Sequence, residues 1–435
     1  MLAIGRSHLD WGSADQPPVA PALAALMDLV APGSRLMLAV SPALATGCAV
    51  LLAALIAREI GCDRRAQILT ALAQATAVWA TLAGHWLTPY SLESAQWLLL
   101  IWLLLRWIRT RDDRLLVLAG IAAGIAAMTQ FRALLLGAVL VAAAAAVGPR
   151  ALLARPMLWV GVAVAAAIVS PTLLWQQSRG WPQLQMATVV AGEAEALYGG
   201  RPGIAVQLLV FAGVLGVPLA CYGLWRLFRA DEMHEYRFMA VTFVVLYVLF
   251  VLTAGRPYYL AGMYAPMVAA GALGLQRRRE SGVDRRWLAR AAVAASVALA
   301  AGVLVLSVSL TRSDAGEQIA RRTADAYHGL AAGQRSRTVI VGESYIVAAY
   351  VDGYSDRYRL PEAYSLSRSY GFFEPPPAEA DSMLFVGRDP QALRQYFDTS
   401  KPIADVGDEM HAYLLSGRRL TWDAIWSRER TLTVS

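Results

Sequence analysis

The chain has 435 residues, of which 57% are hydrophobic and only 16% are charged. Because a soluble domain of ordinary composition carries about 25% charged residues, this composition excludes a cytosolic globular protein. Long uncharged runs fill the chain up to about residue 311, whereas residues 312–435 read as ordinary soluble sequence. The net charge of +7 gathers into no basic patch of the kind that binds nucleic acid. We therefore expect a membrane domain followed by a soluble domain, and no nucleic-acid partner.

Residues 1–35 are expected to lie outside the membrane. They begin with a polar, turn-forming stretch that is neither a signal peptide nor an apolar run long enough to cross a bilayer. Nothing in this stretch would export it, so either a further helix upstream of Met1 or the first spanning helix of this chain carries it across. We expect the upstream helix. Val19–Val30 has apolar residues at helical spacing but is too short to span, which predicts a helix lying on the outer face.

Residues 36–311 contain the candidate spanning helices. A bilayer core about 30 Å thick needs about 20 apolar residues per helix. The candidates are 36–57, 66–84, 89–105, 115–129, 131–148, 157–175, 204–225, 238–254, 258–276 and 287–311. The predicted fold class is an all-α polytopic bundle of about ten transmembrane helices.

The loops between these runs predict the orientation of the chain. Cytoplasmic loops carry the excess of arginine and lysine. The loops 58–65, 106–114, 149–155, 226–237 and 277–290 are rich in arginine, whereas the alternate loops 85–88, 130–132, 176–203 and 255–257 are poor in it. The first set is therefore predicted to be cytoplasmic. Residues 1–35, the long loop 176–203 and the soluble part lie outside in this topology, which is that of a multi-pass protein of a bacterial cytoplasmic membrane.

Residues 312–435 are predicted to form a small extracytoplasmic α/β domain. The stretch 315–332 is helical in pattern. Thr338–Val341 and Met383–Val386 are short apolar or β-branched runs bounded by glycine and charged residues, which is typical of buried strands.

The few polar residues of the membrane part concentrate at the outer ends of the predicted helices. Because transporters place ionisable residues or broken helices near the midplane, apolar helix interiors argue against transport. The outer face combines carboxylates suited to proton transfer, arginines suited to an anion, and aromatic rings suited to a sugar or an apolar chain. These residues are Asp10, Asp15, His85, Glu93, Arg132, Trp175, Gln176, Arg179, Trp181, Arg256, Tyr258 and Tyr259.

Four segments on this outer face resemble a known family in the right order. They are Trp11–Pro18 (WGSADQPP), His85–Glu93 (HWLTPYSLE) followed by Trp97, Leu174–Gln176 with Gly180–Pro182, and Gly255–Gly262 (GRPYYLAG). Each is similar to a loop motif of the bacterial integral-membrane glycosyltransferases related to protein O-mannosyltransferases and the aminoarabinose transferase of lipid A, glycosyltransferase family 39. The resemblance covers nearly the whole chain. Each motif by itself is a weak indication of the family, but the motifs together are a strong one.

The resemblance implies a GT-C fold and a glycosyltransferase activity. The donor would be a polyprenyl-phosphate-linked sugar, the acceptor an extracytoplasmic glycan, lipid or protein, and membrane lipids would surround the bundle. Asp15 and Glu93 would be catalytic. Substrate binding would fall to Arg256, Tyr258, Tyr259, Arg132, Gln176 and Trp181. No residues stand at metal-ligand spacing, and a divalent cation is left open as a cofactor.

Three departures from the family pattern affect this prediction. The family's catalytic acidic motif lies just upstream of the position equivalent to Leu2, so we expect the chain as given to lack both that motif and a first spanning helix. Arg256 replaces a lysine of the family, which keeps the positive charge with a different hydrogen-bonding geometry. Gln130 replaces another family lysine, and Arg132 is a candidate substitute two residues on.

Each candidate also has a simpler interpretation. Asp15 suits a residue that caps the turn before Pro17. Glu93 suits a negative charge that the dipole favours at a helix N-terminus. Arg256 suits a headgroup anchor, while the tryptophans and tyrosines suit the aromatic belt of a membrane protein. The alternative function is a truncated, non-catalytic homologue acting as a membrane scaffold or lipid-binding subunit. A transporter is a third possibility.

Overall fold

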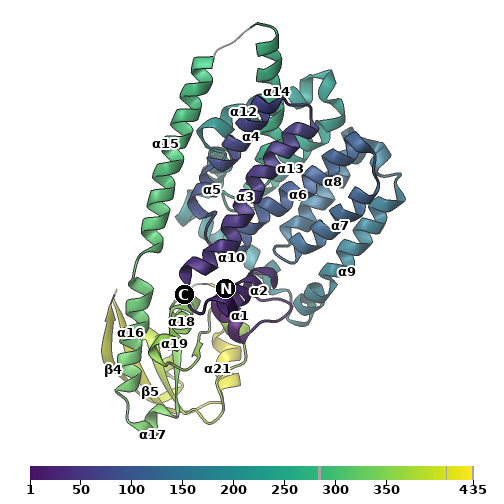
Figure 1. Ribbon diagram of the computed structural model, residues 1–435. Helices are drawn as coiled ribbons and strands as arrows, with labels where there is room; N and C mark the ends of the chain where they lie inside the picture. The colour runs from purple at the N-terminus through teal and green to yellow at the C-terminus, as the bar shows by residue number, and fades with distance from the viewer. Residues whose placement is uncertain (283–285, 408, 434–435) are drawn as a thin grey trace.

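The computed structural model describes residues 1–282, 286–407 and 409–433. A bundle of helices forms one end of the molecule and a small α/β domain forms the other (Figure 1). The N-terminal helices α1 (Leu2–Ser7) and α2 (Val19–Val30) lie between them, while α15 (Arg286–Thr311) runs along the side of the bundle and leads into the α/β domain. The two-part organisation expected from the composition is therefore present in the fold.

Helices occupy all ten of the apolar runs in the sequence. The bundle contains α3 (Arg35–Glu59), α4 (Arg64–Ala75), α5 (Val78–Ala83), α6 (Pro89–Thr110), α7 (Arg114–Ala127), α8 (Arg132–Val147), α9 (Pro156–Ser178), α11 (Gly200–Val210), α12 (Gly213–Arg229), α13 (Arg237–Leu252) and α14 (Tyr264–Glu280), besides α15. Within the described residues, five helices are long and apolar enough to cross a membrane, or six if α11 and α12 are taken together as one bent span. The remaining apolar runs hold shorter helices.

Two expected spans are each broken into two helices. Residues 66–84 form α4 and α5, and residues 204–225 form α11 and α12, which meet at an angle of 93°. Gly213 adopts a positive φ of 80° at the second break, a conformation that glycine reaches without steric cost. The two breaks contact each other, since the amide of Val78 donates to the carbonyl of Phe211 at 3.0 Å. At a break, a backbone group loses its hydrogen-bond partner within the helix. This bond supplies a new partner, as a lipid environment requires.

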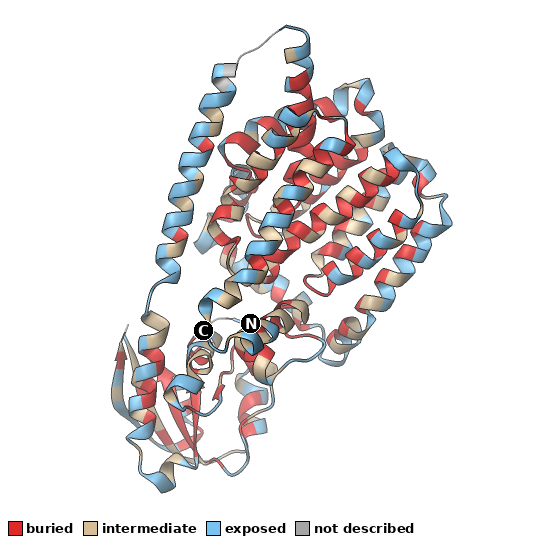
Figure 2. Ribbon diagram, in the orientation of Figure 1, coloured by how far each residue is buried: buried red, intermediate tan, exposed pale blue. Residues whose placement is uncertain are grey.

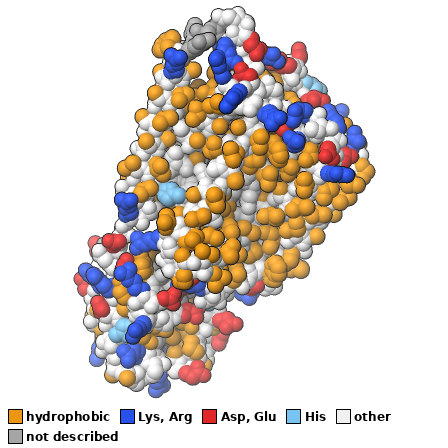
Figure 3. Space-filling model, viewed as in Figure 1, with side chains coloured by type: hydrophobic (Ala, Val, Ile, Leu, Met, Phe, Trp, Pro, Cys, Tyr) orange, Lys and Arg blue, Asp and Glu red, His pale blue; other side chains and the backbone are white. Residues whose placement is uncertain are grey.

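Helix α6 forms the centre of the bundle. It packs against α3 and α7 and contributes the fully buried Trp97 and Trp107, whereas α15 is largely exposed (Figure 2). Small residues let other helices approach closely, because a Cβ on Gly120 of α7 would lie 2.1 Å from the carbonyl oxygen of Gly161 on α9. Apolar side chains cover the flank of the bundle, and charged ones gather towards its far end and on the α/β domain (Figure 3). This distribution suits a surface that faces lipid.

The α/β domain contains a five-stranded sheet of order β2-β1-β3-β5-β4. Its strands are β1 (Thr338–Gly342), β2 (Ala363–Tyr364), β3 (Ser382–Gly387), β4 (Phe397–Gly407) and β5 (Met410–Arg418). β1 pairs in parallel with β2 and β3, and β5 runs antiparallel to β3 and β4. The covering helices and turns are α16 (Ala315–His328), α17 (Ala332–Arg335), α18 (Tyr345–Gly353), α19 (Ser355–Tyr358), η3 (Arg368–Phe372), α20 (Gln391–Arg394) and α21 (Trp422–Glu429). The prediction of a small α/β domain is confirmed, including both expected strands.

Two further helices join the halves of the molecule, and the sequence analysis predicted neither. Helix α10 (Pro182–Tyr198) lies within the long loop 176–203. Helix α1 inserts Ala3 into the core of the α/β domain. Arg6 then bonds both carboxylate oxygens of Asp28 on α2 at 2.7 and 2.8 Å and pairs with Asp356 on α19 at 3.2 Å. The first helix therefore connects α2 to the soluble domain.

Asp352 is a partly buried carboxyl group beneath this junction. Its Oδ2 accepts a hydrogen bond from the Tyr370 hydroxyl at 2.6 Å, and its Oδ1 accepts one from the Ala363 amide at 2.8 Å. Burial removes the carboxylate from water, and this raises the pKa of Asp352 to about 6 despite the two hydrogen bonds.

The raised pKa predicts that the free energy of unfolding depends on pH. The folded carboxyl keeps its proton to a higher pH than the unfolded one, so the stability that Asp352 contributes is complete below about pH 4 and is lost as pH rises through about 6. Asp352→Asn should remove about 2 kcal/mol of this pH dependence. Thermal unfolding of the detergent-solubilised protein between pH 4.5 and 7 measures it, with the exposed Asp389→Asn as control. An unchanged pH dependence in Asp352→Asn would contradict the prediction.

Candidate active site

Polar residues converge at the end of the bundle that faces the soluble domain. Helices α6 and α8 begin there, and the turn between α13 and α14 crosses there. Helix α10, the N-terminal segment and the η3 turn of the soluble domain complete the surroundings. Helix starts and turns leave backbone groups without hydrogen-bond partners, and an apolar layer does not tolerate such groups. Polar residues are therefore expected at this end of the bundle.

A buried ion pair joins the first turns of α6 and α8. Arg132 Nη2 lies 2.5 Å from Glu93 Oε2, and their side chains are only 14% and 7% exposed. The second carboxylate oxygen of Glu93 and the Nε of Arg132 are buried without a hydrogen-bond partner among the described residues. The pair therefore compensates both charges while each group keeps one unused polar atom.

Aromatic rings enclose the guanidinium of Arg132. It lies 3.7 Å from the ring centroid of Tyr259 and 5.1 Å from that of Tyr90, both within the range of a cation–π interaction. Tyr258 packs beside Tyr90 at 4.9 Å and stacks on Trp79 at 4.0 Å. The tyrosine pair of the GRPYY motif thus forms one wall around the buried arginine.

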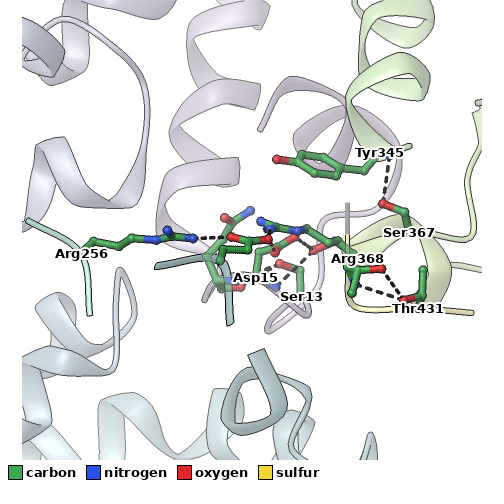
Figure 4. Close-up of polar contacts among 11 residues, drawn as sticks. Ser13, Asp15, Arg256, Tyr345, Ser367, Arg368 and Thr431 are labelled. Carbon is green, nitrogen blue, oxygen red and sulfur yellow. Dashed lines mark hydrogen bonds and ion pairs between the residues drawn. The ribbon is translucent and has the colours of Figure 1, made fainter. Parts of the chain in front are cut away.

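A second set of charges links the membrane domain to the soluble domain (Figure 4). Arg256 Nη2 bonds Glu193 Oε2 on α10, and Glu193 Oε1 in turn accepts from Arg368 Nη2 at 2.9 Å. Arg368 Nη1 lies 3.8 Å from Asp15 Oδ1. Arginine and carboxylate therefore alternate along the series Arg256, Glu193, Arg368 and Asp15, which draws on four separate segments of the chain.

Asp15 is also held by the serine that follows Arg368. The Ser369 hydroxyl donates to Asp15 Oδ2 at 2.6 Å, and the Asp15 amide donates to the same hydroxyl oxygen at 3.2 Å. On its other side, the carbonyl of Ser13 accepts from the side-chain amides of Gln176 at 3.3 Å and Gln183 at 3.2 Å. The position of Asp15 is therefore fixed from both domains.

The two sets of charges meet at Tyr259. Its ring lies 3.7 Å from the guanidinium of Arg132, and its amide donates to the carbonyl of Arg256 at 3.1 Å. The structure thus brings together Asp15, Glu93, Arg132, Arg256, Tyr258 and Tyr259, six of the eight residues singled out from the sequence.

The other two residues have different surroundings. Gln176 is fully buried, and besides its bond to Ser13 it accepts from the Gln183 amide at 3.2 Å, which makes it a structural support for the N-terminal segment. Trp181 precedes α10 with a positive φ of 58° and is 38% exposed. Among the described interactions of Trp181, none reaches the charged groups of the site. Its predicted role in substrate binding gains no support from this position.

Three site residues were missed from the sequence. Tyr90 lies inside the HWLTPYSLE motif, so the motif itself carried its signal. Glu193 and Arg368 sit in stretches without a motif, and only the fold reveals that they meet. Asp10, by contrast, pairs with the indole of Trp175 at 2.6 Å on the exposed surface.

Several buried polar atoms of this site have no hydrogen-bond partner. In the described part of the chain, Glu93 Oε1, Arg132 Nε, Arg256 Nη1 and Arg368 Nε are all buried without a partner. Such atoms cost free energy and are uncommon in native proteins, so four in one site indicate donors and an acceptor kept for a ligand or water. Over the same described residues, no three His, Cys, Asp or Glu side chains gather as metal ligands, so a divalent cation finds no ready site.

Comparison with known proteins supports the GT-C fold that the sequence motifs implied. Residues 15–175 match the model of the dolichyl-phosphate-mannose-protein mannosyltransferase family, a range that begins at Asp15. The structure of ArnT from Cupriavidus metallidurans in the apo state superposes with a TM-score of 0.66 and 14% sequence identity, over 95% of this chain and 91% of that one. The chain has the GT-C fold.

Two further GT-C structures were solved with lipid phosphates. ArnT from Cupriavidus metallidurans bound to undecaprenyl phosphate matches with a TM-score of 0.65 and 13% identity, over 95% of this chain and 92% of that one. The oligosaccharyltransferase AglB from Archaeoglobus fulgidus, in complex with an inhibitory peptide and a dolichol-phosphate, matches with a TM-score of 0.53 and 14% identity, over 89% and 64%. No curated protein matches the sequence significantly.

The buried ion pair predicts a strong and coupled effect on stability. Glu93→Ala or Arg132→Ala leaves a buried charge without its partner, which costs about 3–5 kcal/mol. Removing both should cost less than the sum of the two single changes. The exposed pair Arg111 and Glu235 provides a control, because Glu235→Ala should cost under about 1 kcal/mol. Unfolding midpoints in detergent measure all four variants, and additive losses would contradict a coupled pair.

Proposed function

We propose that this protein transfers a sugar from a polyprenyl-phosphate donor to an acceptor on the outer face of a bacterial membrane. The observation that carries the proposal is the site at the end of the bundle next to the soluble domain, where Arg132 and Arg256 keep buried, unpaired donors beside two carboxylates and an aromatic wall. The GT-C fold and the lipid phosphates named for ArnT and AglB support the same substrate class.

The donor phosphate suits the two arginines of the membrane domain. A phosphate group needs fixed positive charge, and arginine presents several N–H donors to its oxygens. Arg256 has an unpaired Nη1 and Arg132 an unpaired Nε, and Tyr259 contacts both residues through its amide and its ring. The phosphate would bind at this place, with its apolar tail on the lipid-facing flank of the bundle.

The two carboxylates suit different roles. Glu93 is buried in its pair with Arg132, so its main contribution is to hold that arginine. Asp15 is 20% exposed and lies where an acceptor in the aqueous phase has access. Its Oδ2 is held by Ser369, whereas Oδ1 faces Arg368 beyond hydrogen-bonding distance and offers a free acceptor. Asp15 is therefore the better candidate for the general base.

The reaction then follows from these positions. Asp15 takes the proton of the acceptor hydroxyl, and the hydroxyl oxygen attacks the anomeric carbon of the donor sugar. The bond from that carbon to the phosphate oxygen breaks, and its electron pair leaves with the polyprenyl phosphate. Arg132 and Arg256 stabilise the negative charge that develops on the phosphate. A single displacement of this kind inverts the configuration at the anomeric carbon, as the family resemblance implies.

Substitutions at the site should separate binding from chemistry. Arg256→Ala should weaken undecaprenyl phosphate binding about 10-fold or more, because a charged hydrogen bond contributes about 1.5–3 kcal/mol. Asp15→Asn should leave that binding intact and lower transfer by about 10²–10⁴-fold. The measurements are titration with undecaprenyl phosphate and transfer from radiolabelled undecaprenyl-phosphate mannose, arabinose or galacturonic acid to native membranes.

The controls distinguish the alternatives. Arg312→Ala removes an exposed arginine that follows α15, outside the site, and should change neither value. Lipid-phosphate binding without transfer of any sugar by the wild-type protein would support the non-catalytic lipid-binding function instead. Wild-type transfer that survives in both Asp15→Asn and Arg256→Ala would refute the assignment of these residues.

The proposed orientation places the soluble domain outside the cell. Arginine-rich loops gather at the opposite end of the bundle, where Arg106 and Arg109 pair with Glu59 and Arg279 pairs with Asp63. Such loops stay in the cytoplasm. In a background lacking Cys48 and Cys221, a membrane-impermeant maleimide should label Ser427→Cys in intact spheroplasts. It should label Ser281→Cys only after lysis, and the reverse pattern would exclude this orientation.

A further inference from the structure

The soluble domain points the carboxyl ends of its parallel strands at the membrane site. β1 pairs with β2 on one side and β3 on the other, so the chain changes direction at β1. In open α/β sheets ligands bind at such a switch point, outside the carboxyl ends of the strands. The segments that follow β1 and β2 begin at Glu343 and Ser365, and they carry Tyr345, Arg368 and Ser369 towards Asp15 (Figure 4).

The backbone around Arg368 is fixed in an uncommon conformation. Arg368 has a positive φ of 50°, a conformation that is strained for a residue with a Cβ. Its amide donates to the Thr431 carbonyl at 2.8 Å, and the preceding Ser367 hydroxyl accepts from the Tyr345 amide at 3.2 Å. Strain of this kind persists where surrounding contacts hold it, and it occurs often at functional sites.

From this position the Arg368 side chain extends out of the soluble domain. The guanidinium lies 5.2 Å from the ring centroid of Tyr345 and reaches Glu193 at 2.9 Å and Asp15 at 3.8 Å. It is only 15% exposed, and its buried Nε has no partner among the described residues. Ser369 adds the two hydrogen bonds that hold the amide and one carboxylate oxygen of Asp15.

We propose that Arg368 and Ser369 are positioning residues for Asp15, so that the soluble domain completes the active site. This inference rests on the proposed function. Ser369 fixes the rotation of the Asp15 carboxylate by bonding Oδ2, which leaves Oδ1 without a hydrogen bond and able to accept a proton. Arg368 attracts Oδ1 and ties Asp15, through Glu193, to the arginine that meets the donor phosphate. A base held in this way meets its substrate in one orientation, and misplacement by about 1 Å lowers the rate by about 100-fold.

The experiment compares full-length variants reconstituted in liposomes, with the donor sugar that the wild-type protein transfers. Ser369→Ala and Arg368→Gln should each lower kcat by about 10–100-fold. Binding of undecaprenyl phosphate should stay within about twofold of wild type. Arg368→Lys keeps the positive charge and should recover part of the loss. Arg419→Gln is the matched control, because Arg419 forms an exposed ion pair with Asp398 in the same domain and should transfer normally.

A double substitution separates positioning of Asp15 from general damage to the fold. If Ser369 acts through Asp15, adding Ser369→Ala to Asp15→Asn should lower transfer no further, because the base is already absent. Independent, multiplicative losses would overturn the inference, as would normal transfer by both Ser369→Ala and Arg368→Gln. An equal loss of undecaprenyl phosphate binding in these variants would also overturn it. Wild-type protein that transfers no sugar would instead refute the proposed function itself.

Discussion

The pairing of each site arginine with a carboxylate from another segment is the interaction on which the arrangement depends. A charge at the edge of an apolar layer is tolerated when an opposite charge lies beside it. Arg132 satisfies this condition through Glu93, and Arg256 through Glu193. Because each pair joins different segments, compensation of charge also sets how α6, α8, α10 and the α13–α14 turn meet. The need to neutralise these buried charges therefore also determines how the segments pack at this end of the molecule.

The helices that follow a local pattern were predicted well from the sequence. Val19–Val30 matches α2 at both ends, and the long apolar runs match α3, α6 and α9. The breaks were missed because their cause is distant, since the bond from Val78 to Phe211 joins residues more than a hundred positions apart. β4 was missed because Pro402, placed at a shift of register, argues against a strand in any local analysis.

The candidate site likewise contains residues that were predicted from the sequence and residues that were missed. Loop motifs pointed to Asp15, Glu93, Arg256 and Tyr259, and the family lysine missing at Gln130 pointed to Arg132 as its substitute. Glu193 and Arg368 escaped because a carboxylate on a surface helix and an arginine in a soluble domain are common and carry no local signal. Their significance arises from a contact between segments about 175 residues apart.

The burial of Ala3 within the soluble domain has a consequence for how the chain is made. Helix α1 leaves the ribosome early, whereas the strands and helices that enclose it are synthesised after the whole membrane bundle. Contacts of such long range close slowly, because the intervening loop must first be ordered. The segment that holds Ala3 therefore stays partly unpacked until the soluble domain has been synthesised. The candidate site, in which Asp15 meets Arg368, is then completed only after the whole membrane bundle.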